Sequence, residues 1–467
     1  MSDTHRQEAP PAHGRSVSAQ SGREARKRSP RRNAAVWDST ARPVRALDLS
    51  RAQERVRDPR LLPLRYARMA SSPWAYLRGA AAVMAADLAS STHSGLTVQL
   101  CGDAHILNFG FWASPERRLL FDVRDFDETL PGPFEWDLKR LAVSIHVLAD
   151  VEKLGGTCGE DSAAAAVRGY RKAMRRYSGM GELDVWYDQL TPDVPLRGLS
   201  SEFAEAAARS LEKKSKRATH RWSARQLITE RDGRRRITLD PLKRMDDGLS
   251  DRQRALAYRQ VYETYLASIP PHLRRLVGRF THTDAVRQVV GVGSVGMRVW
   301  LNLLDGGSGR QPLFLQAKQA EASVYEEFLA PSEFSNHGER VVVGQRLMQS
   351  AADIFLGHMR VDGIDYYVRQ FRDMKIIPNG SGISAYLPQF ARACGHALAK
   401  AHARSGDPAA ITAYIGRGGS VRGGDSEVRT CIRGSDPCGS RRPRRGDLRG
   451  RRAVTETLTV FPPRGVD

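Results

Sequence analysis

The chain of 467 residues has little cysteine, no long apolar run and comparatively few acidic residues. Its five cysteines lack CxxC spacing, which argues against a zinc site or a disulfide framework and favours a reducing compartment. No segment approaches the roughly 20 apolar residues that a membrane helix needs. The N-terminal residues also lack the apolar region of a secretory signal. We therefore expect a cytoplasmic protein without a membrane span.

Basic residues outnumber acidic ones, and the formal net charge is +21. This balance favours phosphorylated ligands, nucleic acid or an anionic membrane surface as partners. Much of the excess lies at the chain ends, since residues 417–467 contain twelve arginines and six acidic residues. Nucleic-acid binding is therefore expected only through the basic tails. It would be sensitive to salt and would disappear when residues 1–45 and 417–467 are deleted.

The hydrophobic pattern divides the chain into five parts. Both ends lack a helical or strand period, which predicts disorder. The C-terminal tail also allows a second hypothesis, in which the reading frame shifted near Gly416. The parts are a basic N-terminal segment (1–60), a mainly helical region (61–280), a β-rich region (281–375), a further helix (376–416) and an Arg/Gly-rich tail (417–467).

Local patterns predict the elements that surround the most informative residues. Ser72 and Pro73 mark the start of a helix. One face of this helix would carry Trp74, Leu77, Ala81, Met84 and Leu88. The other expected elements are strands at 96–100 and 119–123, hairpins at 233–240 and 354–371, and helices from Trp136, at 338–350 and at 387–404.

The first group of residues with a chemical signature is CGDAHILN, residues 101–108, followed by FDVRDFD, residues 121–127. A carboxylate on a loop after a strand, Asp103, can accept or orient a hydroxyl proton during phosphoryl transfer. Asn108 and Asp125 supply the oxygen ligands that magnesium prefers. Acidic residues as crowded as those at 122–127 repel one another unless a cation lies among them. The alternative is a solvated acidic turn.

The second group is GVGSVG, residues 291–296, followed by Lys318. Gly291, Gly293, Ser294 and Gly296 lie between two strand-like runs, whereas a dinucleotide-binding loop must open a helix. This context favours a glycine-rich hairpin over phosphates, with Lys318 as a phosphate contact. The alternative for Lys318 is a surface lysine that keeps its charge in water.

GDAHILNF resembles the HGDxHxxN catalytic loop of aminoglycoside and choline phosphotransferases, which are protein-kinase-like enzymes. DFDETLPGPFEWDLKRLA is similar to their downstream metal-binding segment. The resemblance implies that Asp103 is the catalytic base, that Asn108 and Asp125 bind magnesium, and that Asp137 braces the catalytic loop. His105 and Asp127 would have supporting roles. Cys101 departs from the pattern, because that family usually has histidine there.

The resemblance extends to the glycine loop and Lys318, which are similar to the phosphate-binding parts of a kinase. Glu326 or Glu339 would then be the acid that pairs with Lys318, and either could instead be a solvated surface residue. These parts follow the catalytic loop here, whereas they precede it in kinases. We therefore expect an α+β fold with two kinase-like lobes in circularly permuted order. Permutation is tolerated where the termini of a fold lie close together at its surface.

The stretch from about residue 60 to 416 also resembles a bacterial family known as domain of unknown function 2252. The phrases that carry this resemblance include QLCGDAHILNFGFWASPER, FDVRDFDETLPGPFEWDLKRLA, GVGSVG and LAKAHARSGD. The resemblance ends near Gly416, where the unusual tail begins. It implies a kinase-like relationship but no substrate.

The leading hypothesis is therefore a phosphotransferase that uses ATP and Mg²⁺ and acts on an unknown hydroxyl acceptor, either a small molecule or a protein. A close variant is nucleotidyl transfer with the nucleotide bound in reverse. A second class is a nucleotide-binding module without catalysis, which Cys101 favours and the presence of Asp103, Asn108 and Asp125 opposes. A third is the basic nucleic-acid-binding protein. The sequence does not indicate the oligomeric state.

Overall fold

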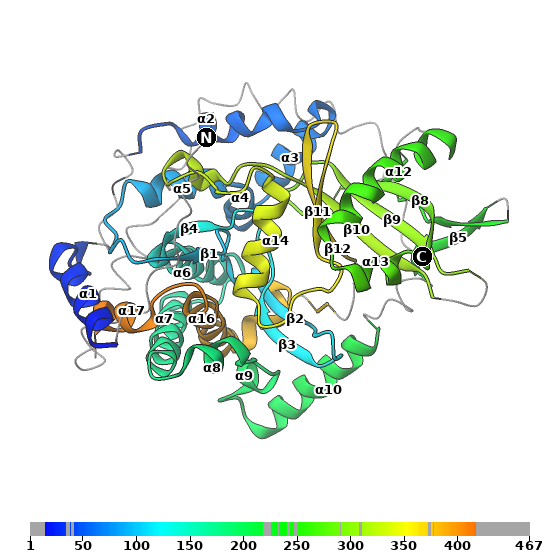
Figure 1. Cartoon of the computed structure of the whole chain (residues 1–467). Coiled ribbons are helices and arrows are strands. Elements are labelled where there is room, and N and C mark those ends of the chain that lie inside the picture. Colours follow the sequence, from blue (N-terminus) through cyan, green and yellow to red (C-terminus); the bar gives the residue numbers. More distant parts are fainter. Residues whose placement is uncertain are drawn as a thin grey trace. The chain divides into compact units, whose positions relative to one another are not determined.

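Helices and strands are mixed throughout the protein, as the α+β prediction requires (Figure 1). Among these elements, no helix combines the length and the apolar character that crossing a membrane demands. The predictions for the tail, residues 417–467, lie outside the described part of the chain. The computed structural model describes residues 15–33, 38, 42–217, 226–231, 233–240, 243–246, 251–289, 291–307, 311–371, 375–376 and 378–416.

The largest sheet in the described part is antiparallel and six-stranded, with the order β7–β8–β9–β10–β12–β11. The strands β8 and β9 form the predicted hairpin around the glycine-rich segment, and β10 lies between β9 and β12. The bounds are β7 (Arg244–Met245), β8 (Thr281–Gln288), β9 (Val299–Asp305), β10 (Leu313–Ala320), β11 (Gly357–Val361) and β12 (Ile364–Gln370).

Both faces of β10 are covered, and every residue of this strand is buried. Because side chains alternate between the faces of a strand, Lys318 and Gln319 point to opposite sides. The helices α12 (Asp251–Ser268), α13 (Pro271–Val277) and α14 (His337–Met348) accompany the sheet. Tyr265 of α12 and Val277 of α13 belong to the same hydrophobic cluster as sheet residues. The boundary predicted at residue 281 therefore separates elements that pack together.

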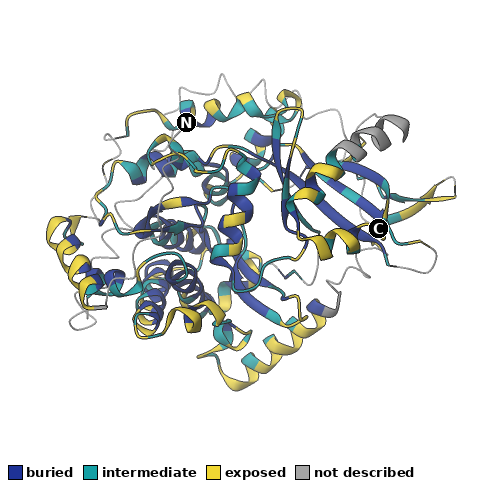
Figure 2. Ribbon diagram, viewed as in Figure 1, coloured by how far each residue is buried: buried dark blue, intermediate teal, exposed yellow. Residues whose placement is uncertain are grey.

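The largest hydrophobic cluster lies among the helices (Figure 2). Three long helices form its centre, namely α6 (Phe134–Val151), α7 (Cys158–Tyr177) and α16 (Leu387–Ala403). The pair α7 and α16 packs closely, because a Cβ atom on Gly395 would lie 2.0 Å from the carbonyl oxygen of Ala166. The late helix α16 is therefore built into the same core as the early helices.

Two short ladders carry the loops of interest into this core. Strand β1 (Thr97–Leu100) pairs with β4 (Leu130–Pro133), and β2 (Phe109–Ala113) pairs with β3 (Leu119–Val123). A third ladder, β5 (Ile228–Arg231) with β6 (Arg234–Ile237), forms the predicted hairpin near residue 233. The remaining helices are α2 (Ala46–Ala52), η3 (Gln53–Val56), η4 (Pro59–Leu61), α3 (Leu62–Met69), η5 (Ile106–Asn108), α8 (Glu182–Tyr187), α9 (Asp193–Leu196), α10 (Ser201–Arg217), η6 (Val324–Glu327), α15 (Gly380–Ile383) and η7 (Ser384–Tyr386).

The helix predicted to begin at Pro73 is divided into two, α4 (Pro73–Gly79) and α5 (Ala81–Ala89). Ala80 leaves the helical conformation between them, with φ −114° and ψ 40°. Buried arginines take the carbonyl groups near the break. Arg140 donates to Leu77 O over 2.7 Å, and Arg65 donates to Gly79 O over 3.3 Å. Contacts from distant side chains thus replace helical hydrogen bonds, which the local pattern does not reveal.

The N-terminal segment, predicted to be disordered to residue 60, contains helix α1 (Arg15–Arg28) and further helices from residue 46 onward. Helix α1 packs against α17 (Pro408–Ile415). A Cβ atom on Gly22 would lie 2.0 Å from Ala410 O, and Tyr414 donates to Ser29 O over 3.2 Å. The prediction is therefore wrong for these residues, because their order depends on a distant helix rather than on their own hydrophobic period.

A fully buried ion pair fastens α16 to β3 and provides a test of the fold. Lys400 and Asp122 are both 0% exposed and bonded to each other, and Lys400 also donates to Ser350 over 3.1 Å. Removing one member of such a pair leaves an uncompensated buried charge. Lys400→Met should therefore reduce the free energy of unfolding by about 3–5 kcal/mol, measured by urea denaturation.

The double variant Lys400→Met/Asp122→Asn should lose less stability than the sum of the single variants, because neither charge remains unpaired. Arg197→Met is the matched control, since its ion pair with Asp193 is 72% and 62% exposed. A loss for Lys400→Met as small as that of the control would contradict the assigned role of the pair.

Candidate functional site

The loop that carries Asp103 is held by a buried carboxylate from helix α6. Asp137 Oδ2 accepts from Cys101 N over 2.6 Å, and Oδ1 accepts from Gly102 N over 3.0 Å. Gly102 has φ +85°, and a Cβ atom there would lie 2.3 Å from Glu128 O, so a larger residue cannot be accommodated. His402 of α16 lies 3.2 Å from Asp137 Oδ2 and fixes it from the other side.

Asp103 points toward a buried arginine that sequence reasoning missed. Arg140 Nε and Nη2 lie 2.9 and 2.7 Å from Asp103 Oδ1. Burial raises the pKa of Asp103, and Arg140 opposes this rise. His105 Nε2 lies 3.8 Å from Asp103 Oδ2. Burial also lowers the pKa of His105 well below its usual value, an effect that the nearby cations Arg78 and Arg140 reinforce, so this ring is neutral near pH 7.

Asn108 stabilises the same loop from within. Its amide Nδ2 donates to the backbone oxygen of Asp103 over 2.7 Å, and its side chain is buried. Its backbone oxygen accepts from Arg124 N over 3.0 Å, which joins the loop to the segment that contains Asp125. With Nδ2 committed to the backbone, Asn108 Oδ1 is the atom that could contact a cation.

Asp125 lies among cations and has an unsatisfied oxygen. Its Oδ1 atom is buried and accepts no hydrogen bond. Burial disfavours the charge of Asp125, but Lys318, Arg369 and Lys375 lower its pKa to about 2, so it is ionised at neutral pH. The backbone oxygen of Asp125 accepts from Cys101 Sγ over 2.9 Å. Cys101 therefore has a structural role, because it joins this segment to the loop that carries Asp103.

The glycine-rich loop between β8 and β9 is fixed by an arginine from the N-terminal region. Arg57 Nη1 donates to Gly293 O over 2.7 Å and to Val295 O over 2.6 Å. Gly291 and Gly296 have φ of +70° and +89°, a conformation that side chains disfavour. Arg57 occupies carbonyl oxygens of the loop, and within the loop the amide of Val295 donates to Val292 O over 3.4 Å.

Lys318 pairs with Asp127 rather than with either glutamate expected from the sequence. Its Nζ contacts Asp127 Oδ2, and Tyr367 donates to Asp127 Oδ1 over 2.8 Å. Glu326 instead caps η6 and lies 3.9 Å from Arg340, and Glu339 lies 4.0 Å from His358. The acid that pairs with Lys318 therefore lies directly after Asp125 in the chain, and it is neither of the two glutamates expected from the sequence.

One cavity of about 140 Å³ brings both groups of predicted residues together. The predicted residues Asn108, Gly296, Asp137, Glu326 and Glu339 do not line it. We call this space the central cavity. Among the residues that line it are Arg57, Arg78, Asp103, His105, Asp125, Asp127, Glu128, Gly291, Val292, Gly293, Ser294, Lys318 and Glu321.

The central cavity contains both an unsatisfied acceptor and an unsatisfied donor. Besides Asp125 Oδ1, the Nε atom of Arg78 is buried without a hydrogen-bond partner. Buried polar groups are nearly always satisfied, so such atoms indicate a ligand. Within the described ranges, no group of three His, Cys, Asp or Glu side chains could hold a metal by itself. Magnesium commonly needs only one or two protein ligands when phosphate and water complete its shell. Of the two predicted ligands, Asp125 lines the cavity and Asn108 does not.

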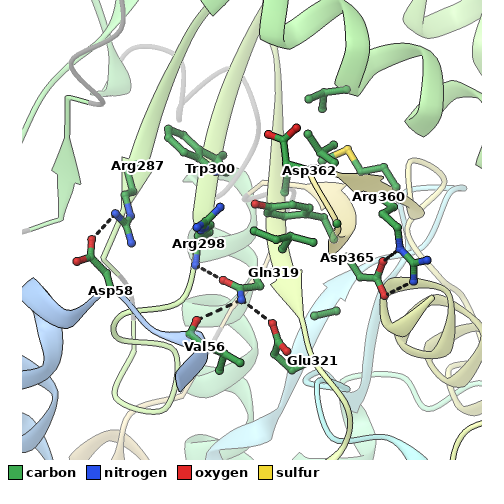
Figure 3. A pocket seen from close by; sticks show the side chains of 18 of the residues that line it. Val56, Asp58, Arg287, Arg298, Trp300, Gln319, Glu321, Arg360, Asp362 and Asp365 are labelled. Atoms are coloured by element: carbon green, nitrogen blue, oxygen red, sulfur yellow. Dashed lines mark hydrogen bonds and ion pairs between the residues drawn. The ribbon is translucent and has the colours of Figure 1, made fainter. Parts of the chain in front are cut away.

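A larger cavity of about 1000 Å³ lies on the opposite face of the sheet (Figure 3). None of the predicted site residues lines it. Its interactions instead fix the segment that carries Arg57. Gln319 Nε2 donates to Val56 O over 3.3 Å, and Asp58 pairs with Arg287 over 2.6 Å (Figure 3). This face of the sheet therefore positions the arginine that holds the glycine loop.

Sequence reasoning missed the arginines and one acid of the site. Arg140 follows Asp137 by one helical turn and could have been found from that spacing. Arg57 and Arg78 gave no local signal, because they reach the cavity from other segments of the fold, whereas Glu128 directly follows Asp127. Their side chains are recognisable as site residues only once the chain is folded.

Comparison with protein-family models identifies the chain. Residues 57–428 match a family described as an uncharacterised protein conserved in bacteria, domain of unknown function 2252. The match covers more than half of the chain, so the protein belongs to this family. It extends to residue 428, whereas the sequence reading placed its end near Gly416. No curated protein and no solved structure matched the chain.

Glu128 provides a test of burial at the central cavity. Burial raises its pKa to about 7, although Val324 N donates to it over 2.8 Å. Between the unfolded pKa near 4.5 and the folded pKa, the unfolded chain is ionised while the folded protein is protonated. Stability is therefore lost as the pH rises through this window, and the full penalty is present above about pH 7.

Glu128→Gln should be more stable than the unchanged protein by about 2–3 kcal/mol at about pH 8, and this difference should shrink toward zero at about pH 4. Urea denaturation at several pH values measures it. Glu327→Gln, at an exposed position of the neighbouring η6, is the control. A pH-independent difference for Glu128→Gln would show that burial does not control this carboxyl group.

Proposed function

We propose that this member of the family is a magnesium- and ATP-dependent phosphotransferase with a circularly permuted, kinase-like fold. The observation that carries the proposal is the central cavity. There the glycine loop, Lys318 and the acids of the two early segments meet, although Lys318 and Asp127 are separated by 191 positions in the chain. An unsatisfied cation, Arg78, and an unsatisfied carboxylate oxygen, on Asp125, face the same small space.

The order of the sheet supports the kinase-like part of the proposal. A hairpin with a glycine-rich loop, β8–β9, is followed by a strand with a buried lysine, β10. Helix α14 and the hairpin β11–β12 then follow, and β12 pairs with β10. The catalytic-loop residues precede all of these elements in the chain, and α16 returns to pack beside them. Permutation accounts for this order.

The residues of the cavity would divide the work of phosphoryl transfer. Lys318 and Arg78 would bind phosphate oxygens, with Asp127 and Tyr367 orienting Lys318. Magnesium bound by Asp125 and Asn108 would neutralise phosphate charge. Asp103 would receive the proton of the acceptor hydroxyl as its oxygen bonds to the γ-phosphorus. The bond between that phosphorus and the bridging oxygen would break, and ADP would leave. The cavity volume suits the phosphate groups, so the rest of the nucleotide would extend beyond it.

A nucleotide-binding module without catalysis is the second candidate. The ion pair between Arg140 and Asp103 favours it, because a carboxylate held by a buried guanidinium is a weaker base. The same ion pair would orient Asp103 in an enzyme, so activity of variants must distinguish the two candidates. With labelled ATP as the substrate, the part of ATP that appears in the product would show whether phosphate or a nucleotide is transferred.

Magnesium-ATP should raise the melting temperature of the unchanged protein. A ligand at one hundred times its Kd stabilises the native state by about 2.7 kcal/mol. Asp125→Asn should abolish this rise because it removes the charge at the metal position. Asp362→Asn, in the exposed turn between β11 and β12, is the control and should keep it. An equal rise in all three proteins would place the nucleotide elsewhere, and no rise in any of them would refute the proposal.

Asp103→Asn should separate catalysis from binding. The variant should keep the rise in melting temperature with magnesium-ATP, while the rate of ATP turnover falls about 10²–10⁴-fold, as expected for loss of a general base. ADP formation measures the rate. Unchanged turnover in Asp103→Asn would exclude Asp103 as the base. Nucleotide binding with no turnover in either protein, across an acceptor screen, would favour the binding module.

A further inference from the structure

A second cavity, of about 250 Å³, lies beyond Asp125 and is distinct from the central cavity. It is formed by the hairpin β2–β3, the end of α14, the loop before β11 and the end of β12. None of the predicted site residues lines it. Four basic residues do, and a single acidic one, Asp353, accompanies them. The basic residues are Arg117, Arg124, Arg369 and Lys375.

The charge of this cavity is not balanced by its own acid. Asp353 is engaged with the backbone, since Oδ1 accepts from Phe355 N over 2.9 Å and Oδ2 accepts from Gln370 N. Asp125, which interacts electrostatically with Arg124, Arg369 and Lys375, lines the central cavity instead, and Asp127 and Asp353 also act on Arg369. The cations therefore carry an excess of positive charge where they meet the second cavity.

Arg124 has two buried donors without partners. Its Nη2 atom donates to Leu107 O over 3.2 Å, but Nε and Nη1 are buried and make no hydrogen bond. Lys375 likewise has no hydrogen bond or ion pair with any described residue. Leaving a charged donor buried and unsatisfied is more unfavourable than leaving a neutral one. Arg124 has two such donors, which indicates that a ligand completes them.

Arg369 holds its guanidinium in a fixed place at the same cavity. Its Nε atom donates to Gln316 Oε1 over 3.1 Å, and Gln316 in turn donates to Gln288 over 2.7 Å. The ring of Tyr367 lies 5.6 Å from the Arg369 guanidinium carbon. This support restricts the side chain, so that less freedom is lost when it binds an anion.

We infer that the second cavity is a binding site for a phosphate group, held by Arg124, Arg369 and Lys375. Two guanidinium groups and the amine of Lys375 match the several oxygens of a phosphate. Burial and the neighbouring arginines lower the pKa of Lys375 well below its usual value, and a bound phosphate would favour its charged form. The volume fits a phosphate with part of the molecule that carries it. This site does not depend on the proposed phosphotransferase function, because its donors are separate from Lys318, Arg78 and the glycine loop.

Titration of the full chain with inorganic phosphate, without magnesium or nucleotide and at constant ionic strength, tests the inference by calorimetry. The unchanged protein should bind phosphate saturably. Arg124→Met and Lys375→Met should each weaken binding about tenfold or more, as expected for loss of a charged hydrogen bond. Arg298→Met, on the opposite face of the sheet, removes the same charge and should bind like the unchanged protein.

Arg124→Lys keeps the charge and should bind phosphate more tightly than Arg124→Met, which separates loss of charge from a folding defect. The melting temperature of each variant without phosphate is the folding control. Absence of saturable binding, or equal affinity in Lys375→Met and the unchanged protein, would overturn the inference even if magnesium-ATP binds as proposed.

A second titration, in saturating magnesium-ATP, distinguishes two sources of the phosphate group. Competition would show that the site receives a phosphate of the nucleotide itself. Simultaneous binding would show that it receives a separate phosphorylated ligand. In either case, phosphate binding should be lost in Lys375→Met. If competition or simultaneous binding persists in that variant, the assignment of the phosphate site to this cavity is overturned.

Discussion

The buried carboxylate of Asp137 joins three segments on which the site depends. It accepts hydrogen bonds from the backbone of Cys101 and Gly102, and His402 contacts it from a helix 265 positions later in the chain. A carboxylate that is 0% exposed is costly unless each of its oxygens is satisfied. The early loop and the late helix α16 therefore stabilise each other through this group. Because that loop carries Asp103, the geometry of the proposed catalytic residue depends on a helix almost at the end of the described chain.

The site contains more basic groups than its ion pairs with acidic residues account for. Arg140 pairs with Asp103 and Lys318 pairs with Asp127, whereas Arg78 at the central cavity and Arg124 at the second cavity have buried donors without partners. The net charge of the whole chain predicts an anionic partner only in general terms, because much of it lies in the tails. The folded arrangement is more specific, since it places unsatisfied donors in two small cavities on either side of Asp125. An anion bound in either cavity would provide acceptors for donors that have none in the protein alone.

The sequence predicted those features that depend on local order and missed those that depend on distant packing. The hairpin around Gly291, the hairpin within residues 354–371 and the late helix α16 were all predicted, because turn residues and hydrophobic periods are local signals. The break at Ala80 and the order of helix α1 were not, because they follow from arginine contacts and from packing against α17. For the same reason, Arg78 could not be recognised as a neighbour of Asp103, although both line one cavity.

The identity of the acid that pairs with Lys318 determines how cation binding and anion binding at the site would be coupled. With a glutamate on a mobile helix, the position of the helix would control the lysine. Here Asp127 holds Lys318 and lies two residues after Asp125 on the same segment, and Tyr367 ties that carboxylate to β12. A cation at Asp125 and an anion at Lys318 would therefore act on one short stretch of backbone. Displacement of either residue would move the other, because the segment between them contains only the buried Phe126. The proposed metal and phosphate positions would thus be linked through the loop. Helix α14 also holds this loop, because Arg340 donates to the backbone oxygen of Asp127 over 2.8 Å.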